Sequence, residues 1–229
     1  MKLKNPFKDL TKFELSLWLV SIAVVTLSFV LPEEKNYLNL CASLIGVTAL
    51  IFVSKGYVLG QALIVVFAVF YGIISFHFRY YGEVITYLGM SAPMAVLSMV
   101  SWIKHPYKSS REVEVNQMNK RQTAIMAVSA VAVTVAFYFI LDYFNTANIV
   151  FSTVSVTTSF VAAYMTYMRS PYYAIGYALN DVVLIVLWVL AAIDNISYIP
   201  MIFCFVMFLF NDLYGFINWQ RIKKRQQSI

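Results

Sequence analysis

Charged residues are scarce in this chain of 229 residues. It has 17 Lys and Arg and 11 Asp and Glu, so 12% of the sequence is charged, whereas soluble domains carry roughly 25%. Hydrophobic residues make up 61%. A water-soluble fold of this size could not bury so much apolar surface. The composition therefore excludes an ordinary soluble domain and predicts a single integral membrane domain, with the lipid bilayer as its surroundings.

Cysteine and histidine are also rare, with two of each. Cys41 and Cys204 lie inside apolar runs and are predicted to be small buried hydrophobes. His77 and His105 lie at predicted helix ends without Cys or His partners, so we expect no metal site. The sequence has no Gly-x-Ser-x-Gly and no phosphate-binding Gly-x-x-x-x-Gly-Lys-Ser/Thr. These absences predict no enzyme, no cofactor and no ATP-driven transport by this chain alone.

Eight apolar segments fill the chain, and a run of about 20 apolar residues spans the bilayer core. The predicted spans are 14–31, 37–53, 58–76, 84–103, 122–141, 149–168, 173–192 and 199–217. The first run follows several lysines, as a signal peptide would, but it ends in Leu-Pro-Glu-Glu-Lys without a cleavage site, so we expect a retained helix. The predicted fold class is an all-α integral membrane protein with eight transmembrane helices.

The basic residues predict the orientation and exclude a nucleic-acid role for the net charge of +6, because they flank the apolar runs. With a cytoplasmic N-terminus, only Lys35 and Arg79 of the 17 fall outside. The inner segments hold the other 15: Lys2, Lys4, Lys8, Lys12, Lys55, Lys104, Lys108, Arg111, Lys120, Arg121, Arg169, Arg221, Lys223, Lys224 and Arg225. Both termini are therefore expected inside, with an even number of spans.

The second half of the chain echoes the first. Residues 57–66 match residues 173–182 at a shift of 116, with five of ten positions identical, and Ser101-Trp102 matches Asn218-Trp219 at a shift of 117. Given the orientation, the halves run in the same direction, as parallel repeats. Transporters built from such repeats hold their substrate where the repeats meet.

The best match covers the second to fourth helices against the sixth to eighth. This three-one-three layout with an extra N-terminal helix is that of SWEET-type sugar transporters, and it predicts a carrier of small solutes. The expected segments of the single domain (1–229) are an N-terminal tail and extra helix (1–35), a first repeat (36–103), a basic cytoplasmic loop with a linker helix (104–141), a second repeat (149–219) and a basic cytoplasmic tail (220–229).

Two carboxylates, Asp181 and Asp212, stand inside apolar runs, and each follows an asparagine. Ionisable groups in the hydrocarbon are costly and indicate function. Helical spacing places both Asn-Asp pairs at similar depth in neighbouring helices. The first half has Ile64, Val65, Met94 and Ala95 at the matching positions, so we expect an asymmetric site. The candidate substrate-binding residues are Gln61, Tyr177, Asn180, Asp181, Trp188, Asn211, Asp212, Tyr214 and Asn218.

Other interpretations of these residues are structural. The Asn-Asp pairs could simply join helices through hydrogen bonds. Trp102 and Trp219, near the inner surface, are predicted to be interfacial anchors. Pro93 and Pro200 are expected to kink or begin helices. Five glycines are predicted to be close-packing points between helices: Gly60, Gly72, Gly89, Gly176 and Gly215.

From about residue 40 to Trp219-Gln-Arg, the sequence resembles the PnuC family of vitamin transporters. The similar patterns are Tyr71-Gly72, then Tyr81-Gly82-Glu83, then Pro93 nine residues before Trp102, and last Tyr214-Gly215-Phe216-Ile217-Asn218-Trp219. Gly176 and Ala95 depart from the family, where many members have a tryptophan and a glutamine.

The resemblance implies a multi-pass bacterial inner-membrane carrier for nicotinamide riboside that works by facilitated diffusion. It also implies trapping by cytoplasmic phosphorylation, a supply to NAD synthesis, and a homotrimer with one pathway per protomer. The alternatives are a carrier of another vitamin such as thiamine or riboflavin, a proton-coupled carrier that uses Asp181 and Asp212, and a membrane receptor that docks a partner on loop 104–121.

Overall fold

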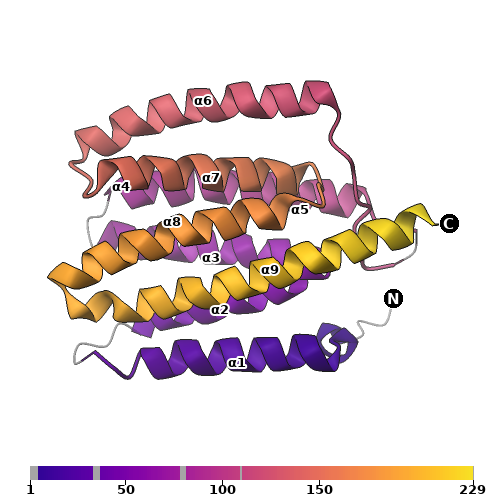
Figure 1. The fold of residues 1–229 in the computed structure, drawn as a ribbon, viewed down its shortest axis with the longest axis horizontal. Coiled ribbons are helices and arrows are strands. Elements are labelled where there is room, and N and C mark those ends of the chain that lie inside the picture. Colours follow the sequence, from indigo (N-terminus) through magenta and orange to yellow (C-terminus); the bar gives the residue numbers. More distant parts are fainter. Residues whose placement is uncertain (1–4, 33–36, 78–80, 109, 229) are drawn as a thin grey trace.

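A computed structural model describes residues 5–32, 37–77, 81–108 and 110–228, which form a bundle of long helices (Figure 1). The helices are α1 (Lys12–Ser28), α2 (Tyr37–Ser54), α3 (Val58–His77), α4 (Tyr81–Val84), the π-helical η2 (Ile85–Ser91), α5 (Ala92–Lys104), α6 (Lys120–Tyr143), α7 (Ile149–Tyr167), α8 (Tyr173–Asp194) and α9 (Ile199–Gln227). Short 3₁₀ turns, η1 (Pro6–Asp9) and η3 (Ile196–Tyr198), precede α1 and α9. Lys2, Lys4, Lys35 and Arg79 of the charge count lie outside the described residues.

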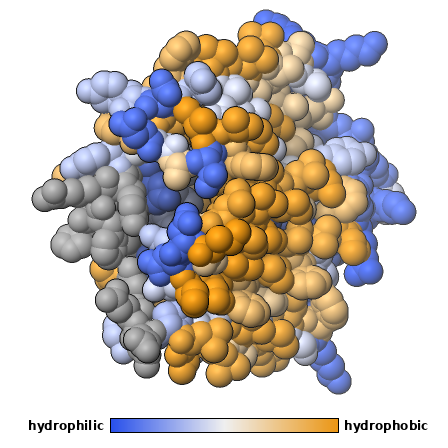
Figure 2. All heavy atoms as spheres, turned by 60° about the vertical axis from the view of Figure 1, so that its left-hand side comes forward, coloured by the Kyte–Doolittle hydropathy of each residue, from blue (hydrophilic) through white to orange (hydrophobic). Residues whose placement is uncertain are grey.

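Each of the eight predicted spans coincides with one helix, because α4, η2 and α5 follow one another without a break. Among the described residues, six helical segments are long and apolar enough to cross a bilayer: Tyr37–Ser54, Tyr81–Lys104, Lys120–Tyr143, Ile149–Tyr167, Tyr173–Asp194 and Ile196–Gln227. Helix α1 has 17 residues and rises about 25 Å, less than the roughly 30 Å of a hydrocarbon core. The described apolar part of α3, Val58–Ile73, is also short. Figure 2 shows a broad apolar surface between hydrophilic groups.

The helices of the first half (α1 to α5) and of the second half (α6 to α9) pack in matching ways. Helix α3 contacts α2 and α5, and α8 contacts α7 and α9. Between the halves, α2 packs against α9 and α5 packs against α7. Helices α1 and α6 lie at opposite edges of the bundle, α1 against α2 and α9 and α6 against α7 (Figure 1). The start of α1 and the end of α9 lie at the same end of the bundle (Figure 1).

Pro93 stands in the first turn of α5, directly after the π-helical η2. A proline inside a helix has no N–H to donate, and its ring clashes with the carbonyl four residues earlier, here that of Gly89. Widening the preceding turn to a π-helix relieves this clash, and it explains why the helix continues. Pro200 lies in the first turn of α9, as predicted for a proline that begins a helix.

Helices α2 and α7 end in the same way, at the end of the bundle that holds the termini. Gly56 (φ 70°) and Arg169 (φ 57°) take left-handed conformations, and their N–H groups donate to Val53 O and Thr166 O. The next N–H groups, of Tyr57 and Ser170, donate to Phe52 O and Met165 O. Both helices thus close with the Schellman pattern, which satisfies carbonyls that lack a partner within the helix.

Side chains from the opposite half cap the same two helix ends. The Trp219 indole N–H donates to Val53 O (3.0 Å), and the Asn218 amide donates to Ser54 O (2.9 Å). In the other direction, Trp102 donates to Thr166 O (3.0 Å) and Ser101 to Tyr167 O (2.9 Å). The two indoles are 0% exposed and their ring centroids are 5.3 Å apart. The prediction of interfacial anchors is therefore wrong for both tryptophans.

The segment between α5 and α6 covers these tryptophans. Its backbone pairs with itself and with the end of α2: Glu114 N–H donates to His105 O, and Val113 N–H donates to Gly56 O (each 2.9 Å). Val113 is 1% exposed and belongs to the apolar cluster around Trp102 and Trp219. The basic loop of the sequence prediction is thus folded against the bundle.

Ion pairs hold this segment at its surface. Arg111 pairs with Asp9 (2.8 Å), and Glu112 pairs with Arg225 of α9. Tyr57 lies close to both carboxylates, and burial together with the charges of Asp9 and Glu112 raises the pKa of its phenol to about 12. Tyr57 therefore stays neutral at physiological pH.

Four of the five glycines predicted as packing points stand against another helix. A Cβ at Gly60 would lie 2.4 Å from Val53 N in α2, and one at Gly72 would lie 2.5 Å from Leu88 in η2. At Gly176 it would meet α7, and at Gly215 it would meet Tyr173 of α8. The prediction is wrong for Gly89, whose nearest neighbour is Ile85 in its own helical turn.

Candidate functional site

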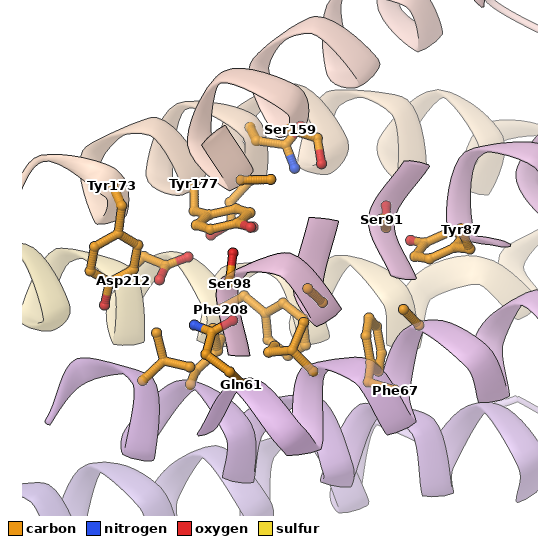
Figure 3. Close-up of a pocket in the computed structure, with 18 of the residues that line it drawn as sticks. Gln61, Phe67, Tyr87, Ser91, Ser98, Ser159, Tyr173, Tyr177, Phe208 and Asp212 are labelled. Atoms are coloured by element: carbon orange, nitrogen blue, oxygen red, sulfur yellow. The ribbon is translucent and has the colours of Figure 1, made fainter. Parts of the chain in front are cut away.

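A cavity lies inside the bundle where the two halves meet. Its lining comes from α2, α3, η2 and α5 of the first half and from α7, α8 and α9 of the second half (Figure 3). The outer helices α1 and α6 contribute none of the lining residues. Figure 3 shows Gln61, Ser98 and Tyr177 around the middle of the cavity, with Tyr173 and Asp212 at one end and Tyr87 and Ser91 toward the other.

Helix α8 contributes the longest polar stripe. Tyr173, Tyr177, Asn180, Asp181 and Leu184 share one face of the helix, at spacings of three and four residues, and all line the cavity. The Thr158 hydroxyl of α7 donates to Asn180 Oδ1 (2.8 Å) and fixes the orientation of the amide. This contact uses the amide oxygen, so the NH₂ group is the part of Asn180 that can serve a ligand.

Two carboxyl groups meet at the cavity wall, Asp181 from α8 and Asp212 from α9. They are 3% and 4% exposed, and both line the cavity. No N–H or O–H group in the described part of the chain donates to Asp181 Oδ2. A buried carboxylate oxygen without a donor is destabilised. A proton or a bound cation would stabilise the two carboxyl groups.

The first half supplies weaker polar groups at the matching positions. Gln61 (2% exposed) stands where the second half has Tyr177, and both side chains line the cavity. Ile64 faces the cavity in place of Asn180, and Ala95 in place of Asp212. Ser98 of α5 adds a hydroxyl. The asymmetry predicted from the sequence is therefore present in the lining.

Of the nine predicted substrate-binding residues, the structure brings five to the cavity: Gln61, Tyr177, Asn180, Asp181 and Asp212. The other four do not line it. Trp188 packs against Tyr198 and Phe205 (ring centroids 5.5 and 6.5 Å). Asn218 caps the end of α2, as described above. Asn211 turns toward α1, where its amide donates to Ser21 Oγ (2.9 Å).

Tyr214 belongs to a second polar cluster, which sequence reasoning missed. Its hydroxyl donates to Glu14 Oε1 (2.8 Å), and Lys55 contacts the same carboxylate at 3.0 and 3.1 Å. Glu14 is 2% exposed and also accepts from the Thr11 N–H (2.7 Å). This cluster joins α1 to α9 and to the turn after α2. Glu14 was missed because it stands at the first residue of a predicted span.

The cavity also contains residues that were not predicted. Tyr87 and Ser91 stand four residues apart in η2, and Ser159 comes from α7. The helical spacing of Tyr87 and Ser91 was visible in the sequence, although single hydroxyls in apolar runs are common and gave no reason to select them. Tyr173 was used only to align the repeats, yet it stands one turn before Tyr177 on the same face.

The lining combines acid, amide, hydroxyl and aromatic groups. Among the described residues that line the cavity there is no Lys, Arg or His. In the described part of the chain no three His, Cys, Asp or Glu residues are grouped to hold a metal ion. Such a lining suits an organic ligand that has hydrogen-bonding groups, a flat ring and a positive charge.

A bundle of apolar helices that encloses a polar cavity between two similarly packed halves is the architecture of a small-solute membrane transporter. The comparisons identify the family. The family model described as nicotinamide mononucleotide transporter matches residues 36–221, and the chain belongs to this transporter family. The chain is therefore a multi-pass membrane protein of a transporter family, not of an enzyme family.

Two relatives are similar to nearly the whole chain. It is 26% identical over 227 residues to the nicotinamide riboside transporter PnuC of Neisseria mucosa, covering 97% of this chain and 86% of that protein. It also matches the crystal structure of the vitamin B3 transporter PnuC with a TM-score of 0.79 and 25% identity, over 95% of this chain and 94% of that one. The resemblance to the PnuC family stated from the sequence motifs is confirmed.

Proposed function

We propose that the protein transports nicotinamide riboside across the membrane through this cavity. The observation that carries the proposal is the lining itself: two carboxyl groups, amides and aromatic rings, with no basic residue among its described members. Nicotinamide riboside has a flat cationic ring, a carboxamide and ribose hydroxyls. The mononucleotide adds a phosphate, which proteins bind with Arg, Lys or helix N-termini. The lining therefore favours the riboside over the phosphorylated compound.

Each group of the lining has a role in this proposal. The rings of Tyr177 and Tyr173 offer faces for the cationic ring. Gln61 and Asn180 provide amides for the carboxamide and the ribose hydroxyls. Asp181 and Asp212 supply the opposite charge. The relatives named above, one a nicotinamide riboside transporter and the other a vitamin B3 transporter, support this assignment.

The architecture belongs to the same proposal. We propose parallel repeats over 36–103 and 149–219, a linker in 104–141 and an additional helix in 1–35. The exchange of capping side chains between the helix ends supports this arrangement. Both termini and the basic tail 220–229 would be cytoplasmic, in a bacterial inner membrane. Transport is passive alternating access, maintained by phosphorylation inside, in a homotrimer with one pathway per protomer.

A binding titration of the purified protein tests the substrate. We expect nicotinamide riboside to bind at micromolar concentrations or below, and nicotinamide mononucleotide to bind at least tenfold more weakly. Thiamine, which is also cationic, and riboflavin, which is neutral, are run beside them. Stronger binding of thiamine or riboflavin than of the riboside contradicts the substrate while leaving the fold unchanged. If none of the four ligands binds, the result contradicts the transport proposal and favours the receptor alternative.

A further inference from the structure

We propose that Thr158 of α7, which lies outside the cavity lining, is a positioning residue that sets which ligands the cavity selects. Its hydroxyl holds the Asn180 amide with the NH₂ group toward the cavity, so this part of the wall selects a ligand that carries a hydrogen-bond acceptor on its ring. The inference rests on the proposed function, in which the acceptor is the carboxamide oxygen of the riboside. It goes further by assigning the selection to a residue that the ligand does not touch.

Small residues bring α7 and α8 close enough for this contact. A Cβ at Gly176 of α8 would lie 3.1 Å from the Ala162 Cβ of α7, so the two helices approach closely at that level. The short turn at 168–172 joins them as antiparallel neighbours. One turn farther along α8 and one turn back along α7 stand Asn180 and Thr158, whose side chains lie 2.8 Å apart. The packing of the two helices therefore fixes the position of the hydroxyl.

The Thr158 hydroxyl has one hydrogen to donate, and the Asn180 oxygen is the acceptor that needs it. The backbone oxygens of Val154 and Ser155 also lie within reach, at 3.0 and 3.1 Å. Both belong to the interior of α7, where helical N–H groups already donate to the carbonyls. The Asn180 oxygen is the nearest of the three acceptors, and no other donor to it is found among the described residues.

The other end of the Asn180 amide remains available to a ligand. The hydrogen bonds of the described residues include none that the Asn180 NH₂ group donates, and the side chain lines the cavity at 7% exposure. A buried N–H group without an acceptor costs free energy, and a ligand acceptor placed against it recovers that cost. A ligand that brings only N–H groups to this place leaves donors facing donors. The cavity is therefore expected to reject it.

The first half of the molecule has no equivalent of this polar pair. Counted back eight residues from the capped carbonyls of α2 and α7, the residue that corresponds to Thr158 is Ile45. Ile64 corresponds to Asn180, as described above. A contact that only joined two helices would be expected in both halves, as the tryptophan caps are. The pair instead occurs in the half that supplies the amide and both carboxyl groups of α8 and α9.

Two ligands of opposite hydrogen-bonding character test the assignment. The 3-acetylpyridine riboside keeps the cationic ring and offers an acceptor at the ring substituent, whereas the 3-aminopyridine riboside offers N–H donors there. In binding titrations the wild-type protein should prefer the acetyl compound by about tenfold or more. A preference for the amino compound would show that the amide oxygen faces the cavity and would overturn the inference. This comparison needs no substitution.

Variants of α7 separate positioning from helix packing. Thr158→Val keeps the shape of the side chain and removes the hydroxyl, so the Asn180 amide can turn and the preference should fall to about threefold or less. Thr158→Ser keeps the hydroxyl and should keep the preference. The matched control is Thr157→Val, because the Thr157 hydroxyl contacts Thr134 of α6 (2.7 Å) and lies outside the cavity lining. This control should show the wild-type preference.

The outcomes distinguish this inference from the proposed function. If Thr158→Val weakens the binding of both analogues equally, or changes neither, the residue only packs the helices. That result overturns the inference and leaves the proposed function intact. If the wild-type protein binds neither nicotinamide riboside nor the two analogues, both are overturned.

Discussion

The two halves of the molecule are alike at the end of the bundle and different in its middle. At the end, Trp102 and Trp219 cap the carbonyls of Thr166 and Val53, and each carbonyl belongs to the residue before the last of its helix. In the middle, Ile64 occupies the place of Asn180. The comparison teaches that the structural contacts at the helix ends are present in both halves, whereas both carboxyl groups and the Asn180 amide of the cavity come from the second half.

The outer helices α1 and α6 likewise share one structural feature and differ in the further contacts that this feature makes. Both α1 and α6 begin with a capping box, Thr11 with Glu14 and Asn119 with Gln122. In α6 the box stands alone at an exposed helix end. In α1 the Glu14 carboxylate also holds Lys55 and Tyr214. The capping box of α6 thus only begins its helix. The capping box of α1 also joins α1 to α9 and to the turn after α2.

The largest effect is expected where the outer helices differ. Glu14→Ala leaves Lys55 largely buried without its partner and should lower the free energy of unfolding by about 4 kcal/mol. Gln122→Ala should lower it by about 1 kcal/mol, since only a capping contact is lost. Thermal unfolding of both variants in detergent measures the difference. The double variant Glu14→Ala/Lys55→Met should recover part of the loss, and equal losses in the two single variants would contradict the distinction.

The packing glycines give a second difference between the halves. A Cβ at Gly60 would lie 2.4 Å from the backbone N of Val53, whereas one at Gly176 would lie 2.7 Å from the end of the flexible Met165 side chain. Gly60→Ala should therefore cost about 3 kcal/mol of stability and Gly176→Ala about 1 kcal/mol. Apparent melting temperatures in the same detergent compare them. A larger loss in Gly176→Ala would show that α7 and α8 cannot adjust as the structure suggests.

Substitution of the two capping tryptophans tests whether the two halves are equally stabilised at their helix ends. Trp102→Phe and Trp219→Phe each remove one buried indole N–H and leave a helix-end carbonyl without its side-chain donor. Each should cost about 2 kcal/mol, with nearly equal shifts in melting temperature. Ser101→Ala and Asn218→Ala serve as the matched pair for the neighbouring carbonyls. A large effect on one side alone would break the symmetry of the two caps.

The smallest effects are expected at the helix N-caps. Thr11→Ala and Asn119→Ala each remove one side-chain acceptor for the N–H of the third helical residue, Glu14 or Gln122. Each should lower stability by about 1 kcal/mol. Hydrogen exchange of the first turn of α1 and of α6 should rise in the corresponding variant. No change in either helix would show that tertiary contacts alone hold these ends.

Hydropathy could predict the eight helices, because it depends on local pattern, and the internal repeat was predicted from matching residues at a shift of 116. The placement of Gln61, Tyr177, Asn180, Asp181 and Asp212 in one cavity also followed from spacing and depth along a helix. Spacing alone does not fix the rotation of a helix about its axis. Asn211 and Asp212 are adjacent, yet one faces α1 and the other the cavity. Only the packing of α1 against α9 decides between those faces.

The tryptophans show a second limit of sequence reasoning. Trp102 and Trp219 stand near the ends of apolar runs, where interfacial anchors are common. Their burial depends on the segment around Val113, which folds back over them through backbone hydrogen bonds. A polar, basic segment gives little sign of such contacts, because they use main-chain groups and one valine.

The most direct test of the account compares Asn180→Leu with Ile64→Leu, which place the same residue at matching positions of the two halves. Uptake of labelled nicotinamide riboside into liposomes would be measured for both variants and for wild-type protein. The account predicts uptake by wild-type protein and Ile64→Leu, and at least a tenfold loss in Asn180→Leu, since a polar contact in the cavity is removed. Absence of uptake by wild-type protein, or equal uptake by the two variants, would contradict it.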